Sequence, residues 1–219
     1  FHKDPLLRQG DTGFGGFALY NLGEARTASR SVDIGGLAAN FRVAHRWGQQ
    51  MNDQIVLDAI YTSGDNNGIS DGKYSGVLTG NNWTTPGAVF FSHGLYLLLP
   101  HGSVVNRFIA ATIDIQNLGY GMQAASLQLH KDLIPHKLKA KVGAGVGYAS
   151  KTIDGMGSQV GTELNFNLRW TMRVFMDLEL HAAYLWLGDF YDSPVVNGSI
   201  DERPRDPWTV FATFKWISF

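Results

Sequence analysis

A two-residue alternation of apolar and polar side chains is the feature that most constrains the fold of this chain. In the stretch 176–191 (MDLELHAAYLWLGDFY), Asp177, Glu179 and His181 occupy one phase, and the other phase is apolar or aromatic as far as Trp186. Successive side chains of a β-strand point to opposite faces of a sheet. We therefore predict a strand with one oily face and one ionisable face, a pattern shared by soluble sheets and membrane barrels.

The same alternation recurs along most of the 219 residues, and helical periodicity is nearly absent. It predicts an all-β, antiparallel fold of about ten strands of barrel-type length, with residues 1–219 forming a single domain. The expected strands cover approximately residues 14–22, 36–47, 54–64, 106–116, 120–130, 137–150, 159–170, 176–191 and 207–219, and a weaker pattern covers 88–99.

Composition narrows the class of protein further. The longest apolar run, 94–100, is far shorter than the roughly 18 to 20 apolar residues of a membrane helix, which argues against a helical membrane protein. The formal net charge of -1 gives no basic excess for phosphate contacts, which argues against a nucleic-acid partner. The absence of cysteine argues against disulfides and thiolate metal sites, and suits a protein that crosses an oxidising periplasm.

The connections between the expected strands differ in length on the two sides of the sheet. The segments 23–32, 65–85, 152–158 and 192–206 are long loops on the far side, whereas 48–53, 131–136 and 172–174 are short turns on the near side. Long loops on one side and short turns on the other are typical of transmembrane barrels. The chain begins at Phe1 without an initiator methionine, which indicates a processed chain, a fragment or a partly observed protein.

Aromatic residues of the oily phase gather near the strand ends. Trp47, Trp170 and Trp216 lie at near-side ends, and Tyr61, Tyr148, Tyr184, Trp186 and Trp208 lie at far-side ends. Two such belts are expected at the interfaces of a bilayer. We therefore predict a transmembrane β-barrel of the bacterial outer membrane, with its oily phase against lipid and its ionisable phase in the lumen. The alternative is a soluble core capped by aromatics.

Several motifs occur in an order that resembles a known family. SGDNNGISDGK (63–73) precedes GTELNF (161–166), AAYLWLGDFY (182–191) and a terminal aromatic strand. Over about residues 54–219 the chain resembles the alginate-export family of bacterial outer-membrane barrels. The resemblance implies a monomeric barrel that passes a polyanionic polysaccharide or other solutes. Because family barrels are about twice as long, it also implies the C-terminal part of a larger barrel or a shortened relative.

The expected lumen is mixed in charge. Its ionisable residues are Arg42, Arg46, Asp58, Lys137, Lys139, Lys141, Glu163, Arg169, Asp177, Glu179, His181 and Lys215. A tight 172–174 turn would place Arg169 nearly opposite Asp177, Asn167 opposite Glu179 and Asn165 opposite His181.

Three interpretations of this lining remain open. The first is a lattice of salt bridges that stiffens the wall, at about 0.2 to 1 kcal/mol per cross-strand pair. The second is a cationic selectivity lining for anionic solutes. The third, and least favoured, is an active site that uses Asp177, Glu179 and His181 in acid–base chemistry.

Other motifs give weaker indications. The loop 65–72 has oxygen donors near the spacing of a calcium loop, but Ile69 stands where such loops offer oxygen, so we favour a solvated turn. The scattered histidines predict no transition-metal site, and we predict no cofactor. The glycines of 143–147 precede no helix, which argues against a phosphate loop and favours close packing or curvature of the wall. No GxSxG motif supports a serine hydrolase.

These observations predict a porin-like channel or exporter for anionic or saccharide solutes. The leading alternative is a structural barrel that encloses or anchors an envelope protein, and a barrel-embedded hydrolase is the least favoured function.

Overall fold

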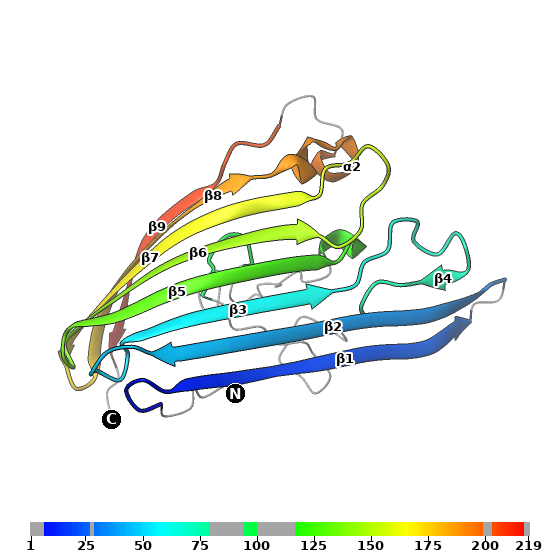
Figure 1. Cartoon of the computed structure of the whole chain (residues 1–219). Coiled ribbons are helices and arrows are strands. Elements are labelled where there is room, and N and C mark those ends of the chain that lie inside the picture. The colour runs from blue at the N-terminus through cyan, green and yellow to red at the C-terminus, as the bar shows by residue number, and fades with distance from the viewer. Residues whose placement is uncertain (1–6, 27–28, 79–93, 100–116, 199–202, 217–219) are drawn as a thin grey trace.

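The computed structural model describes residues 7–26, 29–78, 94–99, 117–198 and 203–216. Within these ranges the chain forms one curved antiparallel sheet of eight long strands (Figure 1). In spatial order they are β1 (Thr12–Arg26), β2 (Ser31–Arg46), β3 (Gln54–Thr62), β5 (Met122–Ile134), β6 (Leu138–Ala149), β7 (Gln159–Arg173), β8 (Met176–Leu187) and β9 (Trp208–Trp216).

Short elements lie at the far ends of these strands. The two-residue strand β4 (Lys73–Tyr74) pairs parallel with β2 and makes the ninth strand of the sheet. The 3₁₀ turns η1 (Asn117–Gly119) and η2 (Asp189–Asp192) precede β5 and follow β8, and the single-turn helix α2 (Pro194–Asn197) follows η2. Among the described residues, no helix is both long enough and apolar enough to cross a membrane.

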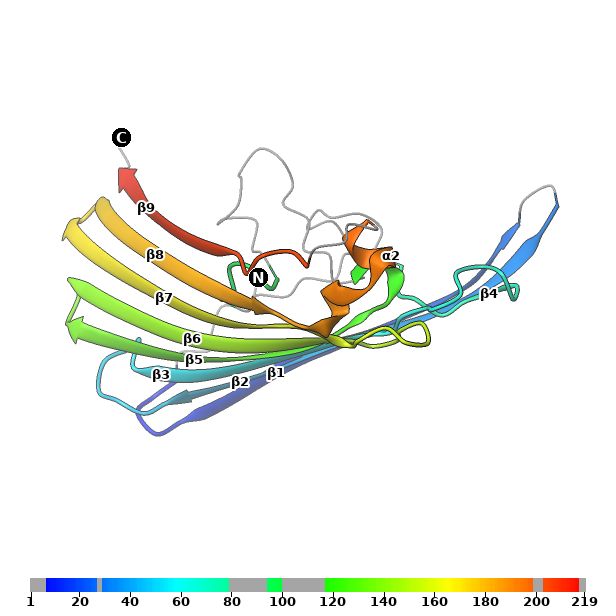
Figure 2. The same cartoon turned by 90° about the horizontal axis from the view of Figure 1, so that it is seen from above.

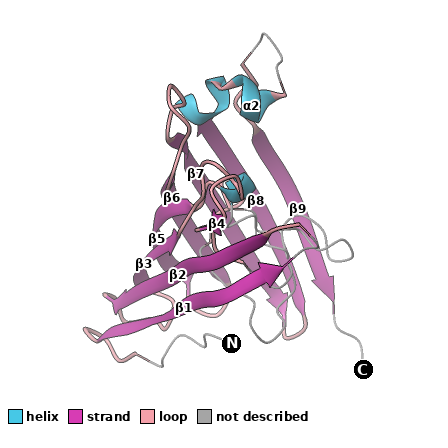
Figure 3. Cartoon of the chain, turned by 90° about the vertical axis from the view of Figure 1, so that its right-hand side faces the viewer, coloured by secondary structure: helices cyan, strands magenta, loops and turns pink. Residues whose placement is uncertain are grey.

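The antiparallel all-β fold predicted from the alternation is confirmed, but a closed barrel is not seen. In the described part of the chain, β1 pairs only with β2 and β9 pairs only with β8, so both remain edges of an open sheet. Figures 2 and 3 show that this sheet is strongly curved and that β9 turns back over its concave side. The expected strand at 106–116 lies outside the described residues.

The connections between strands are short on the near side of the sheet and long on the far side, as predicted, with one exception. Near-side turns are short: β5 and β6 are joined by residues 135–137, and β7 and β8 by Val174 and Phe175. Far-side connections such as 150–158 and 188–207 are long. The prediction of a loop over 23–32 was wrong, because β1 and β2 stay paired from Thr12↔His45 to Arg26↔Ser31 and project as a hairpin.

A short segment lies against the concave face where the sequence showed a weak strand pattern. Gly94–Leu99, named here the inner strap, is an irregular stretch on the concave side of the sheet (Figure 2). Leu95, Leu98 and Leu99 are buried there. They pack with inward-facing residues of the far half of the sheet, namely Ile60, Met122, Ala124, Ala149, Val160 and Leu185, and with Phe190 of η2. Among the described residues, an apolar core therefore lies on the far half of the concave face.

Candidate functional site: the polar concave wall

The concave face of the near half of the sheet is polar. The register aligns side chains from neighbouring strands into rows, one of which runs Arg46, Gln54, His130, Lys141, Asn167, His181 and Phe211 across β2 to β9. The next row toward the near side contains Asp132, Lys139, Arg169 and Glu179. The alternation thus places the predicted lining residues that lie in strands on one face of the sheet.

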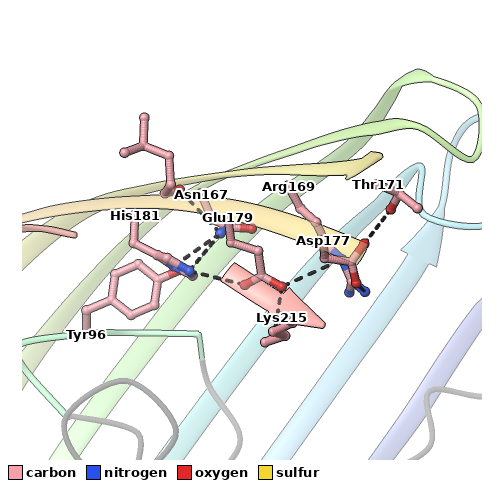
Figure 4. Close-up of polar contacts among 9 residues, drawn as sticks. Tyr96, Asn167, Arg169, Thr171, Asp177, Glu179, His181 and Lys215 are labelled. Atoms are coloured by element: carbon pink, nitrogen blue, oxygen red, sulfur yellow. Dashed lines mark hydrogen bonds and ion pairs between the residues drawn. The ribbon is translucent and has the colours of Figure 1, made fainter. Parts of the chain in front are cut away.

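The densest group of charges lies on β7, β8 and β9 (Figure 4). Glu179 is buried, and one of its carboxylate oxygens accepts a hydrogen bond from Lys215 Nζ at 2.9 Å. The same oxygen lies 3.6 Å from Arg169 Nε. Arg169 also donates to Asp177, whose other oxygen accepts a hydrogen bond from Thr171 Oγ1 at 2.7 Å. Five side chains from three strands therefore form one ionic network.

His181 extends this network toward the inner strap. Its Nε2 lies 3.1 Å from Glu179 Oε2, and its Nδ1 lies 3.1 Å from Asn167 Nδ2 and 3.2 Å from the Tyr96 hydroxyl. These partners fit a neutral ring that donates from Nε2 to the carboxylate and accepts at Nδ1. The ring also stacks on Phe211, with 4.5 Å between centroids and 8° between planes.

The predicted register of the β7–β8 hairpin was wrong by two residues. Arg169 pairs with Glu179, Asn167 with His181 and Thr171 with Asp177. The cause is the turn, which consists of Val174 and Phe175, together with a bulge between Thr171 and Arg173. A bulge adds a residue to one strand and shifts its pairing. Arg169 still reaches Asp177, but diagonally.

Other predicted residues lie apart from this network. Arg42 on β2 pairs with the buried Asp58 on β3, at 2.7 Å between Nη1 and Oδ2. Arg46 donates to near-side carbonyl oxygens, including Leu7 O at 2.6 Å. Lys137 lies in the β5–β6 turn, and Glu163 lies beneath the inner strap. The predicted lining is therefore several local clusters, of which one spans three strands.

A second buried carboxylate stabilises the near-side turn between β2 and β3. Asp53 is 1% exposed and accepts hydrogen bonds from Lys131 Nζ at 2.9 Å and from the Asp132 N–H at 3.0 Å. Burial alone would raise the Asp53 pKa, but these donors outweigh it and hold the pKa below its ordinary value. The Lys131 ammonium also lies 4.4 Å from the centroid of Trp47.

The carboxylates of the loop 65–72 accept hydrogen bonds from nearby backbone N–H groups and so stabilise turns. Asp65 accepts hydrogen bonds from the N–H groups of Asn67 and Ser75, and Asp71 accepts one from the N–H of Lys73. This is the local bonding expected of a turn rich in Asp, Asn and Gly. Among the residues that the structure describes, no group of three or more His, Asp or Glu side chains could hold a metal ion.

The inner strap and Tyr96 were not predicted as part of the site. In sequence, 94–99 is a short apolar run with one tyrosine and no clean alternation. The one available signal was the set of glycines on the inward phase of β6, which we interpreted only as close packing or curvature of the wall. No protein-family model matches this sequence, and no curated protein matches it either.

Proposed function

We propose that this chain forms the wall of an outer-membrane β-barrel channel that passes anionic or saccharide solutes. One observation carries the proposal. Between the two aromatic belts, the outward-facing positions of all eight long strands contain one charged side chain, Lys131, whose ammonium lies 4.4 Å from the ring centroid of Trp47 in the near-side belt. A continuous apolar face of this kind on a soluble monomer would be an aggregation hazard. Against lipid it is the expected surface.

The belts support the same conclusion. All eight predicted interface aromatics lie on the outer face, and each is at least 38% exposed. They are Trp47, Tyr61, Tyr148, Trp170, Tyr184, Trp186, Trp208 and Trp216. On β9 the belts are eight residues apart, which is about 27 Å along a strand. A strand tilted by about 40° would give about 21 Å along the membrane normal, close to the roughly 25 Å apolar band of known barrels.

The excess of cationic side chains on the concave wall supports an anionic solute. Seven of the twelve predicted lining residues are Lys or Arg, and four are Asp or Glu. Lys139 and Lys141 lie side by side with Arg169 and Asn167 of β7, next to the ionic network. Cationic side chains attract anionic solutes. The resemblance to alginate-export barrels supports the same class of solute.

A channel in lipid also needs a closed wall. Hydrocarbon provides no partner for the unpaired N–H and C=O groups of β1 and β9. We propose that both edges are paired in the membrane-embedded form. Resistance to SDS at low temperature, lost on boiling as a shift in gel mobility, is the expected sign of a closed barrel in the purified protein.

Bilayer conductance tests the channel directly. Reconstituted protein should give single-channel steps with anion preference, measured as the reversal potential in a KCl gradient. The triple variant Lys139→Gln, Lys141→Gln, Arg169→Gln should weaken that preference. The control Arg205→Gln removes one exposed cation from the far-side connection. Unchanged selectivity in the triple variant would remove these three residues from the role.

The packed far half of the concave face favours a second candidate function. Ten buried apolar residues, including three of the inner strap, fill this region. A filled interior suits a structural barrel that anchors an envelope protein. Folded, SDS-resistant protein without any conductance would favour this alternative.

A further inference from the structure

Glu163 has an unusual environment for a predicted lining residue. Its side chain is completely buried on the concave face of β7. Its carboxylate accepts hydrogen bonds from three successive backbone N–H groups of the inner strap, those of Tyr96 at 2.8 Å, Leu97 at 2.8 Å and Leu98 at 2.7 Å. Asn165 Nδ2 donates a fourth at 2.8 Å. Successive N–H groups that converge in this way bind an anion, and here the anion is a side chain of the wall.

The strap is also held at its first residue and by the shape of the wall. Gly94 O accepts a hydrogen bond from Asn165 Nδ2 at 3.0 Å. The inward phase of β6 is glycine at 143, 145 and 147. A Cβ built on Gly145 would lie 2.7 Å from the Leu95 side chain, and one on Gly147 would lie 3.3 Å from that of Leu98. These glycines therefore leave the space that the strap occupies.

Docking of the strap places Tyr96 against the polar network. The Tyr96 hydroxyl lies 3.2 Å from His181 Nδ1, and its ring makes edge contacts with His181 and Phe211 at centroid distances of 5.5 and 6.3 Å. Figure 4 shows Tyr96 reaching His181 from the strap side of the network. The strap thus brings an aromatic side chain over the polar half of the wall.

We infer that Glu163 is a positioning residue, whose carboxylate holds the inner strap and Tyr96 against the concave wall and thereby limits the cross-section of the channel. The limit on cross-section rests on the proposed function, whereas the anchoring does not. Glu163 does not act as a lumenal charge that solutes meet, because its carboxylate oxygens already accept four hydrogen bonds.

Thiol labelling tests the anchoring without any need for conductance. The chain has no cysteine, so Leu95→Cys introduces a single thiol at a position that is 0% exposed. Its maleimide labelling rate in folded protein reports how often the strap lifts. Glu163→Gln keeps the shape but turns an amide N–H₂ toward donors, so the rate should rise at least about tenfold. The control Asp177→Asn makes the same change of charge on the same wall and should leave the rate unchanged.

A second pair of variants displaces the strap without touching Glu163. Gly147→Val adds atoms where Leu98 lies, a side chain that Leu95→Cys leaves in place, and should also raise the labelling rate. Gly23→Val, at a glycine with no atom within 4 Å of a built Cβ, should not. Each variant is first checked for the β-sheet circular dichroism of the parent. Unchanged labelling in Glu163→Gln, when Gly147→Val labels faster, would overturn the anchoring by Glu163.

Single-channel steps of Glu163→Gln then separate the two proposals. Faster labelling with larger conductance steps supports both the anchoring and the limit on cross-section. Faster labelling with unchanged steps retains the anchor and overturns the limit on cross-section. Faster labelling of a protein that never conducts would support the anchoring by Glu163 and overturn the proposed channel function.

Discussion

A charge placed at the middle of the outer face gives the sharpest test of the membrane assignment. Ala212 is exposed on β9, four residues from Trp208 and four from Trp216. It therefore lies about 14 Å along the strand from either belt. An arginine there would have to cross much of that distance to bring its guanidinium to the interface. For Ala212→Arg we expect a loss of about 2–4 kcal/mol in the free energy of unfolding from phospholipid vesicles, the cost of Arg or Lys at the midplane of a barrel.

The adjacent residue provides the matched control. Thr213 faces the concave side and pairs with Glu179, so Thr213→Arg places its charge near a carboxylate and away from lipid. We expect a change of less than about 1 kcal/mol, as for a tolerated lumenal substitution. Urea titrations followed by tryptophan fluorescence measure both variants. A cost within about 0.5 kcal/mol for Ala212→Arg is what a water-exposed site gives, and that result would refute the lipid-facing assignment.

Two further predictions concern carboxylates away from that face. Asp58→Ala removes the carboxylate that lies 2.7 Å from the largely buried Arg42 and should lower the free energy of unfolding by about 3–5 kcal/mol. The double variant Arg42→Met, Asp58→Leu should recover most of this loss. Additive losses in a double-mutant cycle, measured by chemical denaturation, would contradict the coupling of the two residues. Burial acts to raise the Asp65 pKa, but hydrogen bonds from Ser75 and Asn67 lower it below its ordinary value. Its stabilisation of the loop is therefore complete above the ordinary aspartate pKa and is lost as pH falls through the lowered value. Hydrogen exchange of the Ser75 amide should show this loss on acidification, and Asp65→Asn should abolish it; equal pH dependence in both proteins would refute the assignment.

The strands and their faces were predictable because they depend on a local pattern. A period of two fixes which side chains share a face, whatever the neighbouring strands do. The segments predicted as 54–64 and 137–150 are β3 at Gln54–Thr62 and β6 at Leu138–Ala149. Pairing across strands is less local. Arg169 and Asp177 were predicted correctly as neighbours on adjacent strands, but the bulge before Arg173 shifted the pairing of β7 with β8 by two residues.

Strand ends were harder to predict than strand centres. The alternation predicts one strand over 176–191, but β8 ends at Leu187 and Asp189–Asp192 form η2. Asp189 Oδ1 accepts a hydrogen bond from the N–H of Gln159 at 2.8 Å, which fastens this turn to the start of β7. The alternation of apolar residues contains no information about such a bond, because it joins residues 30 positions apart.

The inner strap illustrates why the function of a lining residue cannot be assigned from its phase alone. In sequence, Glu163 shares a phase with Asn165, Asn167 and Arg169, and all four were expected in the lumen. The structure gives Glu163 three backbone donors from a segment more than 60 residues earlier in the chain.

This position also changes the charge that a solute would meet. A fully buried carboxylate engaged by four donors contributes little to the field of an open lumen, and Glu179 and Asp177 are engaged by Lys215 and Arg169. In the proposed channel we therefore expect Lys139 and Lys141 of β6, which align with Arg169 and Asn167, to influence a solute more than these carboxylates do. Replacing Lys139 and Lys141 should therefore reduce anion preference more than replacing Arg169, whose guanidinium already neutralises a neighbouring carboxylate. Reversal potentials of the Lys139→Gln, Lys141→Gln double variant and of Arg169→Gln alone compare the two contributions, and a larger effect of Arg169→Gln would contradict this account of the wall.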